Sequence, residues 1–245
     1  MTKCLNCGHV FTGHFCNNCG QKADVERLDI RALAMETLHF FTHFEKGFVH
    51  TSVQFVKRPG GASVAYLRGK RRQFQTPVSY LLIWTGLYIL LHNFIIHYHN
   101  YHVAAGAASL EDQANALLRT HLTPFIFIIL LISALIIYPL LARPMFNFGE
   151  VLVLSMYGGG TYFMLLFLSD LVLGLLFKIN TITPSVFFWQ TSVAALYNLW
   201  FLYSIFKKAG LRWLLFRIIL TAVIISGIGL LLLLYLPLLW LRIVH

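Results

Sequence analysis

Charged residues are scarce in this sequence. Only 11% of its 245 residues are Asp, Glu, Lys or Arg, whereas soluble domains carry roughly a quarter. Hydrophobic residues make up 58%, and the mean hydropathy is +0.71. This balance excludes an ordinary soluble domain and predicts an all-α polytopic membrane protein. No apolar signal segment opens the chain, where Cys4 and Cys7 stand, so we expect the N-terminus to stay inside the cell.

Acidic residues are fewer than basic ones, and the formal net charge is +10. From Lys3 to Arg72 the chain has eleven basic and five acidic residues. A basic segment beside apolar spans predicts contact with anionic lipid headgroups on the cytoplasmic side of a membrane. Nucleic-acid binding is the competing interpretation of a basic patch, and we do not predict it here.

Familiar catalytic motifs are also missing from the sequence. It has no phosphate-binding G-x-x-x-x-G-K-[ST] loop, no G-x-S-x-G nucleophile elbow and no H-E-x-x-H zinc motif. No pair of carboxylates recurs at a useful spacing within an apolar run. We therefore predict that the protein is not an enzyme.

The four cysteines of the chain stand close together near its start, in two C-x-x-C-G knuckles. The glycine after each knuckle permits a tight turn. Four thiolates at this spacing can surround one tetrahedral Zn²⁺, and the metal would supply most of the folding free energy of so short a ribbon. Disulfides are the alternative, which a reducing cytoplasm disfavours. His9 and His14 are alternative ligands. We predict a zinc ribbon over residues 1–24 with a closed, structural site made of Cys4, Cys7, Cys16 and Cys19.

Residues 25–56 predict an amphipathic helix that lies in the membrane interface. Aromatic residues such as Phe48 and Phe55 fall on one side of a helical wheel, opposite a polar face. Packing of this stripe against the transmembrane helices is the alternative. Three residues of the polar face have a spacing compatible with metal ligands, although we interpret them as solvated surface: Glu36, His39 and His43.

A basic hinge over residues 57–77 follows and holds six of the 19 Lys and Arg residues. Its Arg58-Pro59-Gly60-Gly61 sequence is predicted to end the preceding helix, because proline disfavours helical conformation in the residue before it. Pro77 opens the first apolar run. We predict that the hinge contacts anionic headgroups or a protein partner through Arg58, Arg68, Lys70, Arg71 and Arg72.

A C-x-x-C-G and F-C-x-x-C-G-Q pair, followed by R-P-G and Y-x-x-G-K-R before a proline, gives the first third of the chain a recognisable order. In this order it resembles an uncharacterised family of bacterial inner-membrane proteins, a domain of unknown function best known from Bacteroidota. Phe74 stands where the family has a tyrosine. The resemblance implies an inner-membrane location and carries no known reaction. The matching residues are Cys4, Cys7, Gly8, Phe15, Cys16, Cys19, Gly20, Gln21, Thr51, Arg58, Pro59, Gly60, Tyr66, Gly69, Lys70, Arg71 and Pro77.

Five apolar runs make up the predicted transmembrane domain, residues 78–245. Each reaches the ~20 residues that a helix needs to cross the hydrocarbon core. Lys and Arg are most frequent before the first run and in alternate loops after it, which predicts a cytoplasmic N-terminus and a periplasmic C-terminus. The predicted spans are 78–97, 122–141, 151–177, 185–206 and 213–241.

Within these spans, Asp170 and His92 form a candidate intramembrane polar site. A carboxylate in a span costs about 2.5–3.5 kcal/mol on insertion scales. Asp170 lies toward the outer end of its run, so we expect it to reach water, with an ion or proton relay as the alternative. The Gly158–Gly160 run predicts close helix packing, with local unwinding as the alternative. Tyr157 is among the aromatic residues expected at the membrane interface.

A predicted outer loop is rich in histidine. Three of its histidines have the spacing H-x-H-x-x-H, which could bind a transition metal. A polar loop tip holds such residues equally well, and that is the interpretation we favour. The histidines of this loop are His97, His99, His102 and His121.

Taken together, these features predict a non-enzymatic inner-membrane scaffold, assembly factor or accessory subunit. Its zinc ribbon and basic segment would bind a protein partner or anionic lipid. The alternative is a small channel, transporter or lipid-handling protein that uses Asp170, His92 and the glycine run as a path. The odd number of spans and the lack of an evident internal repeat weaken the transporter interpretation.

Overall fold

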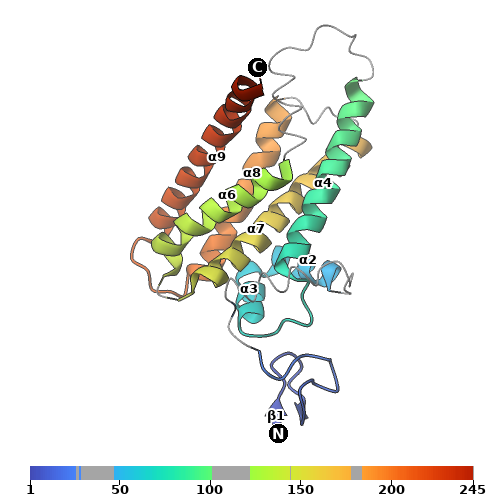
Figure 1. Cartoon of the computed structure of the whole chain (residues 1–245), viewed down its shortest axis with the longest axis vertical. Coiled ribbons are helices and arrows are strands. Elements are labelled where there is room, and N and C mark those ends of the chain that lie inside the picture. Colours follow the sequence, from blue (N-terminus) through green and yellow to red (C-terminus); the bar gives the residue numbers. More distant parts are fainter. Residues whose placement is uncertain (26–27, 29–46, 101–121, 144, 178–183, 245) are drawn as a thin grey trace.

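A computed structural model describes residues 1–25, 28, 47–100, 122–143, 145–177 and 184–244. These residues form a bundle of long helices with a small cysteine-bearing unit at one end (Figure 1). Most of the predicted interfacial segment, with Glu36, His39 and His43, lies outside the described residues. His102 and His121 of the histidine-rich loop lie outside them as well.

The cysteine-bearing unit is built on two short strands, β1 (Thr2–Lys3) and β2 (Val10–Phe11). They pair antiparallel, with Thr2 opposite Phe11 and Lys3 opposite Val10. The ring of Phe11 is buried against Cys4 and Cys16. This core is very small, so its apolar burial alone supplies little of the free energy needed to order the unit.

Two short helices form a corner at the same end of the bundle. α2 (Phe48–Lys57) ends just before Arg58, as the proline predicts, and α3 (Pro59–Leu67) begins at once. Pro59 takes the first position of α3, where its fixed φ suits a helix and its missing N–H costs nothing. The hinge is therefore half helical, and only residues 68–76 form a loop.

The aromatic side of α2 faces the bundle. Phe55 is fully buried and its ring stacks on that of Tyr157, with centroids 4.3 Å apart. For Phe55, the structure therefore shows the second of the two predicted roles, which is packing against the helices. The interface prediction for Tyr157 is wrong. Its ring lies in the core, where the hydroxyl donates a 2.6 Å hydrogen bond to the Gln75 carbonyl and so keeps a polar partner.

A helix lies over each of the five apolar runs. α4 and α8 are continuous helices, while α6 and α7 each end in a π-helical segment, η2 and η3. α7 is central, since it packs against α4, α6 and α8, and α9 packs on α6 and α8 (Figure 1). The bounds are α4 (Pro77–Asn100), α6 (Leu122–Ile137), η2 (Tyr138–Ala142), α7 (Phe148–Ser169), η3 (Asp170–Leu176), α8 (Pro184–Phe206) and α9 (Leu214–Val244).

Two described stretches, Pro77–Ile95 and Phe148–Leu176, are long and apolar enough to cross a membrane. Two further apolar stretches are shorter, Phe127–Ala142 and Leu214–Gly229. These stretches give coarse support for membrane association. The number of crossings and the orientation of the chain stay predictions.

The glycine run of α7 serves close packing. A Cβ atom added at Gly160 would lie 2.6 Å from the Tyr80 ring, and one at Gly159 would lie 2.9 Å from Leu130. α7 continues as an α-helix through this run, so the unwinding alternative does not apply. The helix instead changes its hydrogen-bonding pattern later, at Asp170.

Neighbouring glycines of α3 offer a matched test of this packing. A Cβ atom at Gly60 would overlap the backbone carbonyl of Ser204 on α8, whereas one at exposed Gly61 would meet only Arg58 Cβ at 3.8 Å. We expect Gly60→Ala to destabilise the bundle by about 1–3 kcal/mol. Gly61→Ala should be neutral or stabilising by about 0.5–1 kcal/mol. Thermal unfolding in detergent measures both, and equal melting temperatures for the two variants would contradict the predicted close contact.

Candidate metal centre and its docking loop

The two cysteine knuckles fold in the same way. In each, the glycine N–H donates to the carbonyl of the first cysteine, from Gly8 to Cys4 at 2.9 Å and from Gly20 to Cys16 at 2.8 Å. Both glycines have positive φ, +77° and +73°. That conformation is costly for other residues, so C-x-x-C-G is the local sequence that this turn requires.

The knuckles bring the four cysteines together. Their sulfur atoms all lie within 4.8 Å of one another, with Cys4 and Cys19 3.6 Å apart and Cys7 and Cys16 3.7 Å apart. All four thiols are free, so the disulfide alternative is not what the structure shows. Tetrahedral bonds of about 2.3 Å place two sulfurs roughly 3.8 Å apart. The predicted ligand set therefore fits one metal ion.

The thiols differ in their readiness to become thiolates. The His9 N–H lowers the pKa of Cys7 to about 6, and the Cys7 N–H also lowers the pKa of Cys4. Partial burial raises the pKa of Cys19 to about 11. A metal ion must displace this proton on binding, so its affinity should decrease as the pH falls.

The cysteine ribbon is docked on the basic hinge through one side chain. Gln21 follows the second knuckle and is 5% exposed. Its Nε2 donates to the Gly69 carbonyl, and its Oε1 accepts a 3.1 Å hydrogen bond from the Arg72 N–H. Both ends of the buried amide are thereby satisfied by the loop.

Gly69 makes this docking sterically possible. Its φ is +100°, and a Cβ atom there would lie 2.8 Å from Leu5 of the first knuckle and 3.3 Å from Val25. Lys70 borders a groove along the first knuckle together with Lys3. The loop therefore presents a glycine to the ribbon, and the basic residues stand on either side of it.

Four of the five predicted hinge cations have exposed side chains: Arg58, Arg68, Lys70 and Arg72. Arg71 differs from the other four. It is half-buried, and its guanidinium lies 6.0 Å from the centre of the Tyr66 ring. This geometry suits a cation–π contact, so Arg71 has a packing role within the hinge.

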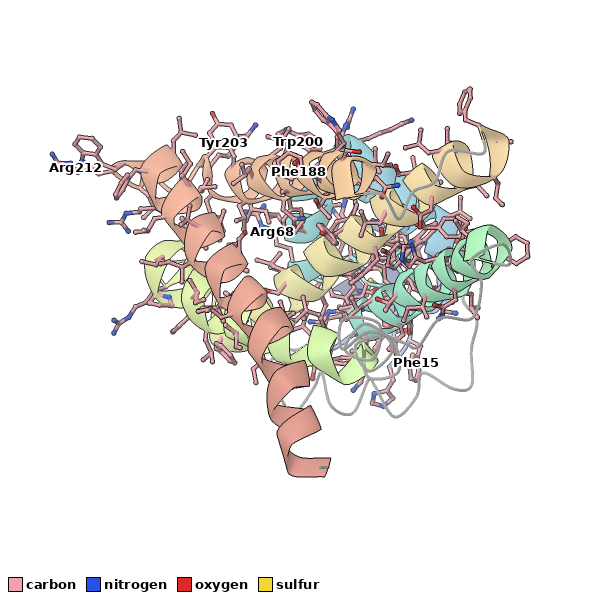
Figure 2. The ribbon with its side chains drawn as sticks, turned by 90° about the horizontal axis from the view of Figure 1, so that it is seen from above. Phe15, Arg68, Phe188, Trp200, Tyr203 and Arg212 are labelled. Atoms are coloured by element: carbon pink, nitrogen blue, oxygen red, sulfur yellow. The ribbon has the colours of Figure 1, made fainter. Side chains whose placement is uncertain are left out.

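Further exposed cations gather at the same end of the bundle. The α6–α7 and α8–α9 connections lie beside α3 in Figure 1, and Arg212 reaches outward from the second of them in Figure 2. The side-chain amide of Asn147, which caps α7, bonds to the Leu28 carbonyl at 3.0 Å and fixes the chain that follows the ribbon. The additional exposed cations are Lys57, Arg143, Lys207, Lys208 and Arg212.

The structure brings together His92 and Asp170, the predicted intramembrane pair, but in surroundings that the sequence did not predict. His92 Nδ1 lies 2.8 Å from Asp170 Oδ2, and Gln190 Nε2 donates to Asp170 Oδ1 at 2.9 Å. Asp170 is only 1% exposed. Our expectation that it reaches water is therefore wrong, because side chains from α4 and α8 solvate the carboxylate.

Two site residues were missed at the sequence level, Gln21 as a docking residue and Gln190 as a partner of Asp170. Gln21 could have been recognised from the sequence, because it closes the F-C-x-x-C-G-Q pattern. Gln190 is an isolated amide in an apolar run, and no sequence pattern marks it.

The cysteine cluster yields a first test. Cys16→Ser should remove the bound metal, because Cys16 is a buried member of the closed ligand set. His14→Ala is the matched control, since this exposed histidine lies in the same loop and outside the cluster. Elemental analysis of the purified chain should find one metal ion per chain in the control and none in Cys16→Ser. Metal retained by Cys16→Ser would refute the four-sulfur site.

The docking contact yields a second test. Gln21→Ala should weaken the attachment of the ribbon to the loop, since it leaves the buried Gly69 carbonyl without this partner, at about 1–3 kcal/mol, and also removes the acceptor of the part-buried Arg72 N–H. Trypsin should then cleave after Lys70 and Arg72 several-fold faster, with metal content unchanged. Lys22→Ala, at the exposed neighbouring position, should cleave like the wild type. Equal cleavage of Gln21→Ala and the wild type would show that the contact does not protect the loop.

Comparison with known proteins identifies one segment. A family model described as a protein of unknown function (DUF3667) matches residues 45–89. The matched residues include α2, α3, the loop on which the ribbon docks and the first half of α4. No curated protein and no solved structure matches the chain. The chain thus contains a domain of unknown function at residues 45–89, consistent with an uncharacterised family.

Proposed function

We propose that this protein is a non-enzymatic scaffold of a bacterial inner membrane, in which a zinc ribbon holds a basic loop in a fixed shape. That loop binds anionic lipid headgroups and supports a protein partner. One observation carries the proposal: the Gln21 side chain bonds to both Gly69 and Arg72. A ribbon that served only its own stability would not need a buried amide aimed at the cationic loop.

Zinc is the metal that this ligand set favours. Four cysteine sulfurs in a tetrahedral arrangement suit a soft, d¹⁰ ion without redox chemistry. Four protein ligands also leave no open position for a substrate or water, so the ion has a structural role. Bound zinc would supply the folding free energy that the small core around Phe11 lacks.

Membrane insertion is supported by the outer faces of the bundle. Large apolar side chains are exposed along α8 and α9, and Trp200 and Tyr203 lie on the outer side of α8 in Figure 2. Such faces are unfavourable in water and suit contact with lipid chains. They favour five spans in all. The most exposed include Trp189, Val193, Leu196, Leu215, Phe216 and Val223.

Orientation follows from the distribution of cations. Exposed Lys and Arg side chains gather at the end of the bundle that carries the ribbon. Positively charged segments stay on the cytoplasmic side of bacterial inner membranes. We therefore place the N-terminus in the cytoplasm and the C-terminus in the periplasm, with the basic loop at the level of the inner headgroups.

Anionic headgroups suit the loop because each Lys or Arg near an anionic membrane surface contributes about 1 kcal/mol. Arg68, Lys70 and Arg72 are exposed within five residues of one another, and the ribbon fixes the backbone between them.

Transport, the alternative function, has less support. α7 continues through the glycine run that had suggested a break in the helix.

Native mass spectrometry of the full chain, purified in mild detergent with equal phosphatidylglycerol and phosphatidylcholine, tests the proposed function. The triple variant R68A/K70A/R72A should retain several-fold less phosphatidylglycerol, because three cations are removed. Cys16→Ser should lose a similar amount because the loop is no longer held. The matched control K207A/K208A/R212A removes three exposed cations at the same end of the bundle. Adding Cys16→Ser to this control should still reduce the amount of phosphatidylglycerol that is retained. Undiminished phosphatidylglycerol in Cys16→Ser would rule out a role for the ribbon in lipid binding.

A further inference from the structure

The proposed scaffold function does not involve one group of polar side chains within the bundle. His92 on α4, Asp170 at the start of η3 and Gln190 on α8 meet between three elements of the bundle. They come from segments far apart in the sequence, so no local turn accounts for their meeting. Among the residues that the structure describes, these three side chains hydrogen-bond to one another.

Two side chains face the carboxyl group of Asp170. Oδ2 faces His92 Nδ1 at 2.8 Å, and Oδ1 accepts from Gln190 Nε2 at 2.9 Å. A carboxylate only accepts hydrogen bonds, and opposite a carboxylate the imidazole donates through Nδ1. The Nδ1–H tautomer leaves the lone pair of Nε2 as the acceptor.

The imidazole is more accessible than the carboxylate. The side chain of His92 is 21% exposed and that of Asp170 is 1% exposed. The group also lies away from the basic loop. His92 follows the start of α4 by fifteen residues, which is about 22 Å along a helix. Asp170 opens the π-helical segment η3, and such segments are frequent at functional sites.

We propose that His92 is a proton-accepting centre in the half of the bundle away from the basic loop, with Asp170 as its positioning residue and Gln190 as a second hydrogen-bond donor to Asp170. The proton donor is water or the hydroxyl group of a ligand that reaches Nε2. This arrangement, an acceptor imidazole oriented through its other nitrogen by a buried carboxylate, is the one that general bases use.

The transfer step needs no rearrangement of the site. The Nε2 lone pair takes the proton, and the donor leaves as its conjugate base. The Nδ1–H bond to Asp170 persists, and the new imidazolium forms a neutral pair with the carboxylate. Because Asp170 keeps both hydrogen bonds in either state, the buried charge is never left without a partner.

The other groups around the pair do not compete for the proton. On α4 the Tyr88 ring stacks on the imidazole, with centroids 5.2 Å apart and planes 26° apart. On α7 the nearby titratable group is Tyr162, which packs in the same hydrophobic cluster as Tyr88. α8 contributes Gln190, which does not titrate. Phenols are neutral at ordinary pH, so Asp170 is the charged partner that faces His92.

Chemical modification tests whether Nε2 of His92 has the free lone pair of a proton acceptor. Diethylpyrocarbonate acylates a neutral imidazole through its free lone pair, and peptide mapping of the full chain in detergent measures the rate at each histidine. We expect wild-type His92 to react, within about tenfold of exposed His50 on α2. Asp170→Asn should react roughly tenfold or more slowly, because the amide no longer enforces the Nδ1–H tautomer.

Controls separate positioning from folding. Size-exclusion profiles and tryptophan fluorescence should match the wild type in Asp170→Asn, and the rate at His50 should be unchanged. If the variant does not fold, ¹⁵N spectra of wild-type histidine side chains still decide. A Nδ1–H tautomer at His92, assigned by its loss in His92→Gln, supports the proposal. A Nε2–H tautomer, or a wild-type His92 that does not react while His50 does, would overturn it.

Discussion

The amide side chain of Gln21 joins the two parts of this molecule. It is buried, and it bonds at one end to the Gly69 carbonyl and at the other to the Arg72 N–H. Breaking this contact would leave the buried Gly69 carbonyl and the buried Gln21 amide without these partners, at about 1–3 kcal/mol each. The position of Gln21 depends in turn on the second knuckle, whose Cys16 N–H donates to the Gln21 carbonyl at 2.8 Å. These two contacts link the basic loop to the cysteine cluster.

From the loop the contacts continue into the bundle. Phe74 lies near the end of the loop, and its ring packs edge-on against Tyr66 of α3 with centroids 6.2 Å apart. Tyr66 packs in the same way on Tyr157 of α7, 5.2 Å away. Close approach at Gly60 fixes α3 against α8. A metal ion held by the ribbon can thus influence the base of the helices through packed side chains, without a contact of its own.

Local patterns in the sequence predicted the features that depend on local geometry. The C-x-x-C-G spacing predicted the cysteine cluster, because the turn needs glycine, and apolar length placed a helix over each of the five runs. Asp170 and Tyr157 show where such patterns fail. Each is buried with a polar partner from a distant part of the chain. The partner of Asp170 is Gln190, and that of Tyr157 is the Gln75 carbonyl. Only tertiary packing brings those partners near, so position within a span could not distinguish a buried polar group from an interfacial one.

Hydrogen–deuterium exchange of the Arg72 backbone amide, with and without the proposed zinc ion, tests most directly whether a metal holds the basic loop. The measurement uses the unmodified chain in detergent and a chelator to remove the ion. Loss of the ion should free Gln21 and make this amide exchange about fivefold faster, since the net loss of one such hydrogen bond is about 1 kcal/mol. Amides in the buried core of α7 should stay protected. An Arg72 amide that exchanges at the same rate before and after zinc removal would contradict the coupling of ribbon and loop.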